Sequence, residues 1–103
     1  MSRLSSKERA RLRSQAHPLK PILQVGADGI SPAFGRSLTE AFNTRELLKV
    51  KVLDTSDLSA REAADAVGGE VDGVEVVQVI GRTLVLYRPF PEEAGEEGAA
   101  GRR

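Results

Sequence analysis

The chain of 103 residues has no cysteine, no tryptophan and only one histidine. The absence of cysteine excludes disulfide bonds and thiolate metal sites, and it is compatible with a reducing compartment. A single histidine leaves no second imidazole for a metal centre and no thiol–imidazole pair for nucleophilic catalysis. The glycine-rich segment does not end in Gly-Lys-Ser/Thr, so the phosphate-binding loop of nucleotide hydrolases is missing. We therefore expect a protein that is not an enzyme, with no cofactor, no metal and no small-molecule substrate.

Long apolar runs are also missing. No stretch approaches the roughly 20 apolar residues of a membrane-spanning helix, and the N-terminal residues lack the apolar centre of a signal peptide. Hydrophobic residues make up 40% of the chain and charged residues 29%, which is typical of a soluble globular domain. We expect a cytoplasmic protein without a membrane partner.

The net charge of zero conceals an uneven distribution of charge. Residues 1–51 contain ten lysines and arginines against four acidic residues, whereas residues 52–103 contain five against eleven. The two halves thus carry net charges of +6 and −6. Such a distribution favours one surface for an anionic partner. Chance clustering combined with an acidic tail is the alternative.

Two capping boxes predict where helices begin. The pair Ser5 and Glu8 opens a helix over about 5–16, and the pair Ser59 and Glu62 opens a later one. The later helix contains Gly68-Gly69, which costs about 1 kcal/mol per glycine relative to alanine. We expect it to continue or resume up to Gly73, because the apolar spacing is kept.

Alternating apolar residues predict strands. Leu48, Val50 and Val52 lie on one side of a strand over 47–53. Further elements are a helix over about 32–45 and strands over 20–25, 74–80 and 82–88. The helix between the first two strands favours parallel pairing, and Gly81-Arg82 suits a tight hairpin. The order αβαβαββ predicts an α+β fold of two or three layers on a mixed four-stranded sheet.

A Gly-x-x-Gly loop, Gly26–Gly29, separates the first strand from the helix that follows it. Ser31 is a good N-cap, and Pro32 fits the first helical position. Two glycines permit a tight turn and close approach of a ligand, and a helix N-terminus attracts phosphate. The loop is a candidate clamp for a nucleic-acid backbone, in which Ala27 and Asp28 act through their N–H groups. An ordinary strand-to-helix turn is the alternative.

Basic side chains supply further candidates for RNA binding. The first helix is expected to offer phosphate-neutralising groups at Lys7, Arg9, Arg11 and Arg13. Lys20 is the basic residue nearest in sequence to the Gly26–Gly29 loop. A solvated helix face is the alternative for the helical cluster. His17 precedes Pro18, so we interpret it as a helix-terminating residue rather than a catalyst; stacking on an RNA base is the alternative.

Several blocks of the chain resemble a known family. The blocks are His17-Pro-Leu-Lys-Pro21, the Gly26–Gly29 loop with its flanking Val25 and Ile30, and Val79-Ile-Gly-Arg-Thr-Leu-Val-Leu-Tyr-Arg-Pro89. Over roughly residues 4–89 the chain is similar to bacterial single-domain members of the CRM family (chloroplast RNA splicing and ribosome maturation), the YhbY-like proteins.

The resemblance implies an RNA-binding domain over 1–89, with a fold similar to the C-terminal domain of translation initiation factor three. It also implies that the loop contacts RNA and that the partner is ribosomal RNA in precursors of the large ribosomal subunit. Another structured RNA, or a protein–protein adaptor role in ribosome assembly, is the alternative. The Glu-rich composition of residues 90–103 predicts a disordered acidic tail. Two features depart from the family pattern: the loop interior has no basic residue, and Gly68-Gly69 lies within the third helix.

Overall fold

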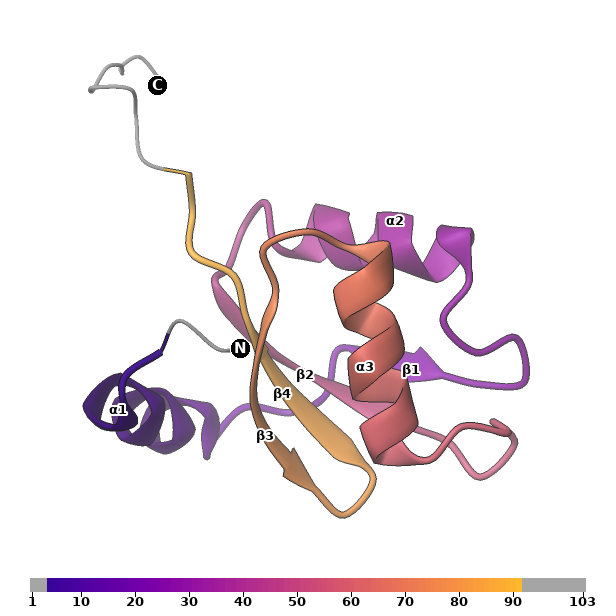
Figure 1. The fold of residues 1–103 in the computed structure, drawn as a ribbon, viewed down its shortest axis with the longest axis horizontal. Helices are drawn as coiled ribbons and strands as arrows, with labels where there is room; N and C mark the ends of the chain where they lie inside the picture. Colours follow the sequence, from indigo (N-terminus) through magenta and orange to yellow (C-terminus); the bar gives the residue numbers. More distant parts are fainter. Residues whose placement is uncertain (1–3, 92–103) are drawn as a thin grey trace.

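Seven elements follow one another in the predicted order in the computed structural model, which describes residues 4–91 (Figure 1). They are α1 (Ser6–Ala16), β1 (Leu23–Val25), α2 (Pro32–Ala41), β2 (Leu47–Val52), α3 (Ala60–Glu70), β3 (Glu75–Ile80) and β4 (Thr83–Tyr87). The four strands form one sheet in the order β1-β2-β4-β3. The predicted α+β fold is confirmed.

The sheet is mixed, as its connections require. β1 pairs with β2 in parallel, whereas β2–β4 and β3–β4 are antiparallel. The hairpin between β3 and β4 turns at Gly81, whose φ of +56° suits a primed turn. The register of β3 against β4 shifts between Val76 and Gln78, so β3 contains a bulge.

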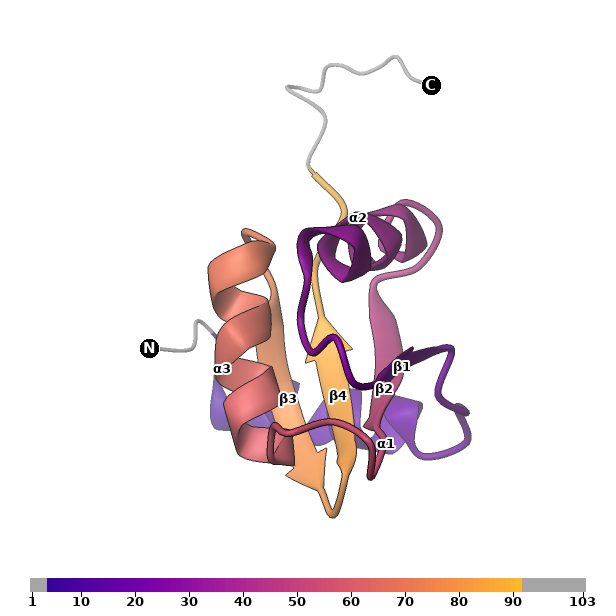
Figure 2. The same ribbon diagram turned by 90° about the vertical axis from the view of Figure 1, so that its right-hand side faces the viewer.

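Three layers result, because helices cover both faces of the sheet (Figures 1 and 2). α2 and α3 lie on one face, where the main core includes Leu38, Val67 and the predicted inward residues of β2. α1 lies on the opposite face, where Leu12 and Ala16 pack against Val77 and Val85. The sheet therefore separates the basic first helix from the other two helices.

All three helices begin at a serine N-cap, as the sequence predicts. Ser5 and Ser59 form complete capping boxes with Glu8 and Glu62. The backbone N–H of Ser5, which donates to Glu8 Oε1 at 3.0 Å, keeps the pKa of the Glu8 carboxyl below its ordinary value. Ser31 caps α2 through its hydroxyl, which accepts the N–H of Phe34.

Two predicted boundaries in the first half of the chain are wrong. The strand expected over 20–25 begins at Leu23, although the N–H of Ile22 still donates to the carbonyl of Lys49 at 3.0 Å. The helix expected over 32–45 ends at Ala41. There the N–H of Thr44 donates to the carbonyl of Ala41 at 3.3 Å, so the chain closes a turn instead of continuing the helix.

The predicted end of the third helix is also wrong. α3 continues without interruption through Gly68-Gly69, but it ends at Glu70 and does not reach Gly73. Val71 is extended, with φ −130° and ψ 120°. Its side chain joins the main core, so burial of this valine ends the helix.

The described part of the chain stops shortly after β4. The prediction of an acidic tail over 90–103 lies outside the described residues apart from Phe90 and Pro91. The N–H of Phe90 donates to Glu46 Oε2 at 2.5 Å. None of the helices within residues 4–91 has the length and apolar character needed to cross a membrane.

Candidate nucleic-acid interface

The Gly26–Gly29 loop is a closed turn with an accessible tip. The N–H of Gly29 donates to the carbonyl of Gly26 at 3.0 Å. Gly29 has a φ of +65°, a left-handed conformation that favours glycine. Ala27 and Asp28 at the tip are exposed.

The tip offers two unsatisfied backbone donors. Within residues 4–91, the N–H groups of Ala27 and Asp28 donate to no protein atom. The start of α2 offers fewer free N–H groups than an uncapped helix N-terminus. Pro32 has no N–H, and the N–H of Phe34 already donates to Ser31 Oγ at 3.1 Å. The two tip amides and the N–H of Ala33 in the first turn of α2, which has no acceptor among residues 4–91, are therefore available to an anion.

A second loop, residues 53–58 between β2 and α3, packs against the Gly26–Gly29 loop. A Cβ on Gly26 would lie 3.7 Å from Thr55 Oγ1, and a Cβ on Gly29 would lie 3.6 Å from Leu58 Cδ1. The N–H of Leu53 donates to the carbonyl of Val25 at 2.8 Å. The carboxyl ends of the two parallel strands thus place the two loops against each other.

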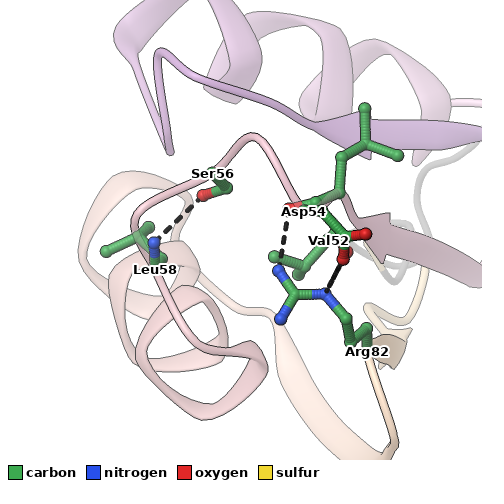
Figure 3. A network of polar contacts seen from close by, with 6 residues as sticks. Val52, Asp54, Ser56, Leu58 and Arg82 are labelled. Atoms are coloured by element: carbon green, nitrogen blue, oxygen red, sulfur yellow. Dashed lines mark hydrogen bonds and ion pairs between the residues drawn. The ribbon is translucent and has the colours of Figure 1, made fainter.

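Arg82, in the β3–β4 hairpin, ties the 53–58 loop to the sheet (Figure 3). Its Nε donates to the carbonyl of Val52 at 2.9 Å, and its Nη2 donates to that of Leu53 at 2.7 Å. Farther along the loop, the N–H of Leu58 donates to Ser56 Oγ at 3.1 Å, and Ser56 is buried. These hydrogen bonds hold the 53–58 loop in place against the Gly26–Gly29 loop.

The charges around the two loops are not predominantly basic. Asp28, Asp54 and Asp57 are all exposed in the two loops. Arg82 Nε lies 3.5 Å from Asp54 Oδ1, but the Asp54 side chain is 98% exposed. An ion pair so open to solvent contributes little. Electrostatic attraction for a polyanion must therefore come from elsewhere on the molecule.

The structure does not bring the basic residues of α1 together with the Gly26–Gly29 loop. Figure 1 places α1 at the left and the chain after β1 at the right, with the sheet between them. Lys7, Arg11 and Arg13 are exposed on α1, and Lys20 is exposed in the segment that leads to β1. The predicted site residues are therefore divided between the two sides of the sheet.

Arg9 differs from its neighbours on α1, because the fold uses its guanidinium. Its Nη1 donates to the carbonyls of Val76 and Val77 at 2.8 and 2.7 Å. These carbonyls belong to the bulge in β3, where the ladder with β4 is disturbed. Arg9 thus satisfies backbone groups that the bulge leaves without regular partners.

Comparison with known proteins identifies the family. The family model of the CRS1/YhbY (CRM) domain matches residues 4–88. The chain belongs to the CRM family. This CRM domain is 40% identical over 91 residues to "Probable RNA-binding protein YqeI" of Bacillus subtilis, with 86% of this chain and 92% of the relative covered.

Two further similarities extend the comparison. The CRM domain is 35% identical over 92 residues to an "RNA-binding protein" of Haemophilus influenzae, covering 89% of this chain and 92% of the relative. The solution structure of a hypothetical protein from Staphylococcus aureus superposes with a TM-score of 0.68 at 33% identity. That match covers 89% of this chain and 95% of the other.

Sequence reasoning missed one basic residue of the CRM domain near the Gly26–Gly29 loop, Arg82, whereas it expected Lys51 to extend the binding surface if helices leave that side of the strand uncovered. Arg82 was part of a family block but had no assigned role. Lys51 is exposed and pairs with Gln24, two residues before the loop. The alternation of β2 puts Lys51 on the α1 face. Within residues 4–91, no group of three or more His, Asp or Glu side chains could hold a metal ion.

Proposed function

We propose that this CRM domain is a non-catalytic, cytoplasmic RNA-binding protein that acts on ribosomal RNA in precursors of the large ribosomal subunit. Membership of the CRM family and the RNA-binding names of the two relatives support the RNA part of the proposal. The ribosomal target rests on the resemblance to YhbY-like proteins. The observation that carries the proposal is the exposed loop tip with its two free N–H groups.

The loop is suited to hold an RNA backbone. The N–H groups of Ala27 and Asp28 donate to phosphate oxygens, and the glycines on either side let the phosphate come close. The 53–58 loop and Arg82 hold the turn in place before RNA arrives, so little conformational entropy is lost on binding. Contacts to phosphate position the RNA, and its shape or unpaired bases supply specificity.

Basic groups on the α1 face supply the long-range attraction. Lys7, Arg11 and Arg13 are exposed on α1, and Lys51 is exposed on the sheet beside it. Neutralising phosphates with such groups releases counterions from the RNA. Because α1 and the Gly26–Gly29 loop lie on opposite sides of the sheet, an RNA that meets both must pass around an edge of the domain.

The experiment measures affinity for a fragment of large-subunit ribosomal RNA, with transfer RNA of similar length as the competitor. We expect log affinity to fall linearly with log salt concentration, and we expect Lys7→Gln with Arg13→Gln to reduce that slope by about 1–2. Crosslinking in cells should recover large-subunit precursors. Crosslinks to transfer RNA alone would overturn the ribosomal assignment. An absence of RNA binding at low salt would favour the adaptor role.

A further inference from the structure

A groove of about 610 Å³ lies on the α1 face of the sheet, away from the Gly26–Gly29 loop. Arg13 and His17 line it from α1 and its end, and Gln78, Ile80 and Val85 line it from β3 and β4. The groove exists because α1 covers only part of this face. Ile80, at the end of β3, is 50% exposed as a result. The volume lies within the range of small-molecule and cofactor sites.

The walls of the groove are fixed by hydrogen bonds within the protein. The ammonium of Lys49 donates to the carbonyl of Leu19 at 3.0 Å and to that of His17 at 3.4 Å. This holds the turn after α1 against the sheet. Arg9 holds the bulge directly before Gln78. A ligand therefore meets a preformed site, and less entropy is lost on binding.

The chemistry of the lining matches a nucleotide. Ile80 provides exposed apolar surface for the face of a base, and the imidazole of His17 can stack on a base. The amide of Gln78 has both a donor and an acceptor, as the edge of a base requires. Arg13 carries a positive charge for the phosphate, and none of the described carboxylates lines the groove.

We propose that this groove binds one unpaired nucleotide of the RNA, with the base on Ile80 and the phosphate at Arg13. The proposal rests on the proposed function, because it assigns a second contact on the same RNA. His17 stacks on the base and Gln78 bonds its edge. A paired base cannot enter this site on the protein. In A-form RNA the base edges lie at the bottom of a deep major groove or in a shallow minor groove of the duplex.

Charge favours RNA over a protein as the occupant. An apolar peptide would bury Arg13 without a negative partner, which is costly. The groove is lined by the cations Arg13 and Lys49, and Lys51 lies exposed farther along β2. A polyanion with a flat apolar base satisfies both the charge and the apolar surface.

The first test uses a short single-stranded oligouridine and a blunt RNA duplex as probes, at one fixed salt concentration. We expect His17→Ala to weaken oligouridine binding about five- to tenfold, at the lower end of what loss of one stacked base causes. Affinity for the duplex should not change. His17→Phe should retain oligouridine affinity, because a phenyl ring also stacks. Equal losses of affinity for the oligouridine and for the duplex would overturn the proposal, because His17 would then contribute only through charge or through the stability of the fold.

The second test separates Gln78 from glutamines elsewhere on the surface. We expect Gln78→Ala to weaken oligouridine binding several-fold, whereas Gln15→Ala, on the exposed side of α1, should bind as the parent does. Photocrosslinking with 4-thiouridine in the oligouridine should attach RNA to peptides that contain His17, Gln78 or Ile80. Mass spectrometry identifies those peptides.

The outcomes distinguish this inference from the proposed function. If the parent binds RNA but its crosslinks fall only in residues 26–29 and 53–58, the groove proposal is wrong and RNA binding stands. If the parent binds neither probe but binds the large-subunit ribosomal RNA fragment, the groove proposal alone is wrong; if it binds none of the three, both are wrong. Ultracentrifugation without RNA supplies a further check. A change from dimer to monomer on Gln78→Ala would identify the groove as a contact between copies and overturn its assignment to RNA.

Discussion

Replacing Gly29 with alanine tests the conformation of the loop and its proposed role together. The φ of +65° at this position costs an L-residue about 1–2 kcal/mol. A Cβ there would lie 3.6 Å from Leu58 Cδ1, an ordinary contact, so backbone strain and not a clash is the expected cost. For a domain of this size, that cost lowers the Tm by roughly 4–16 °C. Gly29→Asn should lose less, because asparagine tolerates the left-handed region.

Gly26→Ala is the matched control for the strain. Gly26 is not among the glycines with positive φ, and its Cβ would lie 3.7 Å from Thr55 Oγ1, so the Tm should stay close to that of the parent. RNA affinity should nevertheless fall in both variants, because a methyl group stands where a phosphate must approach. Thermal denaturation followed by circular dichroism gives the Tm, and fluorescence anisotropy gives the affinity. Equal Tm losses in the two variants would refute the strain argument. Parent-like RNA affinity in both folded variants would refute the clamp.

Four further predictions follow from single features. Arg9→Ala should lower the free energy of unfolding by about 1.5–3 kcal/mol, as expected for loss of hydrogen bonds to a charged group. Arg13→Ala should leave it unchanged, and urea unfolding of the two variants measures the difference. Asp28→Lys should raise RNA affinity at fixed salt, because the tip exchanges a repelling charge for an attracting one, and an unchanged affinity would contradict the clamp. Gly68→Ala should stabilise α3 by about 0.5–1 kcal/mol, since no described atom other than those of its chain neighbours and the nearby helix backbone lies within 4 Å of its Cβ position. Truncation after Pro91 should leave the Tm unchanged and tighten RNA binding, because four glutamates are removed; a large loss of Tm would show that the tail packs.

Features whose partners are close in sequence were predictable. The capping boxes at Ser5 and Ser59 need only a glutamate three residues later, and both helices begin where these pairs predict. The inward residues of β2 followed from a period of two, and Gly81 marked the hairpin. The tight turn at the Gly26–Gly29 loop was predictable for the same reason, because its closing hydrogen bond spans three residues.

Features that depend on distant partners were not predictable. Arg9 meets carbonyls 67 and 68 residues away, so composition gave no reason to separate it from Lys7 or Arg13. The separation of α1 from the loop depends on which face of the sheet the helix covers. The end of α3 depends on the burial of Val71 in the core. The sequence pattern also gave no indication that α1 covers only part of its face, which creates the groove.

The two outer strands of the sheet affect how this protein behaves at high concentration. An uncovered strand edge can recruit the edge of another molecule and start aggregation. At one border, β1 is only three residues long and follows Pro21, which cannot donate a backbone hydrogen bond. At the other border, β3 is interrupted by its bulge, where Arg9 occupies two carbonyls. Both borders are thus poor templates for strand addition, which favours solubility while part of the sheet face stays open to a ligand.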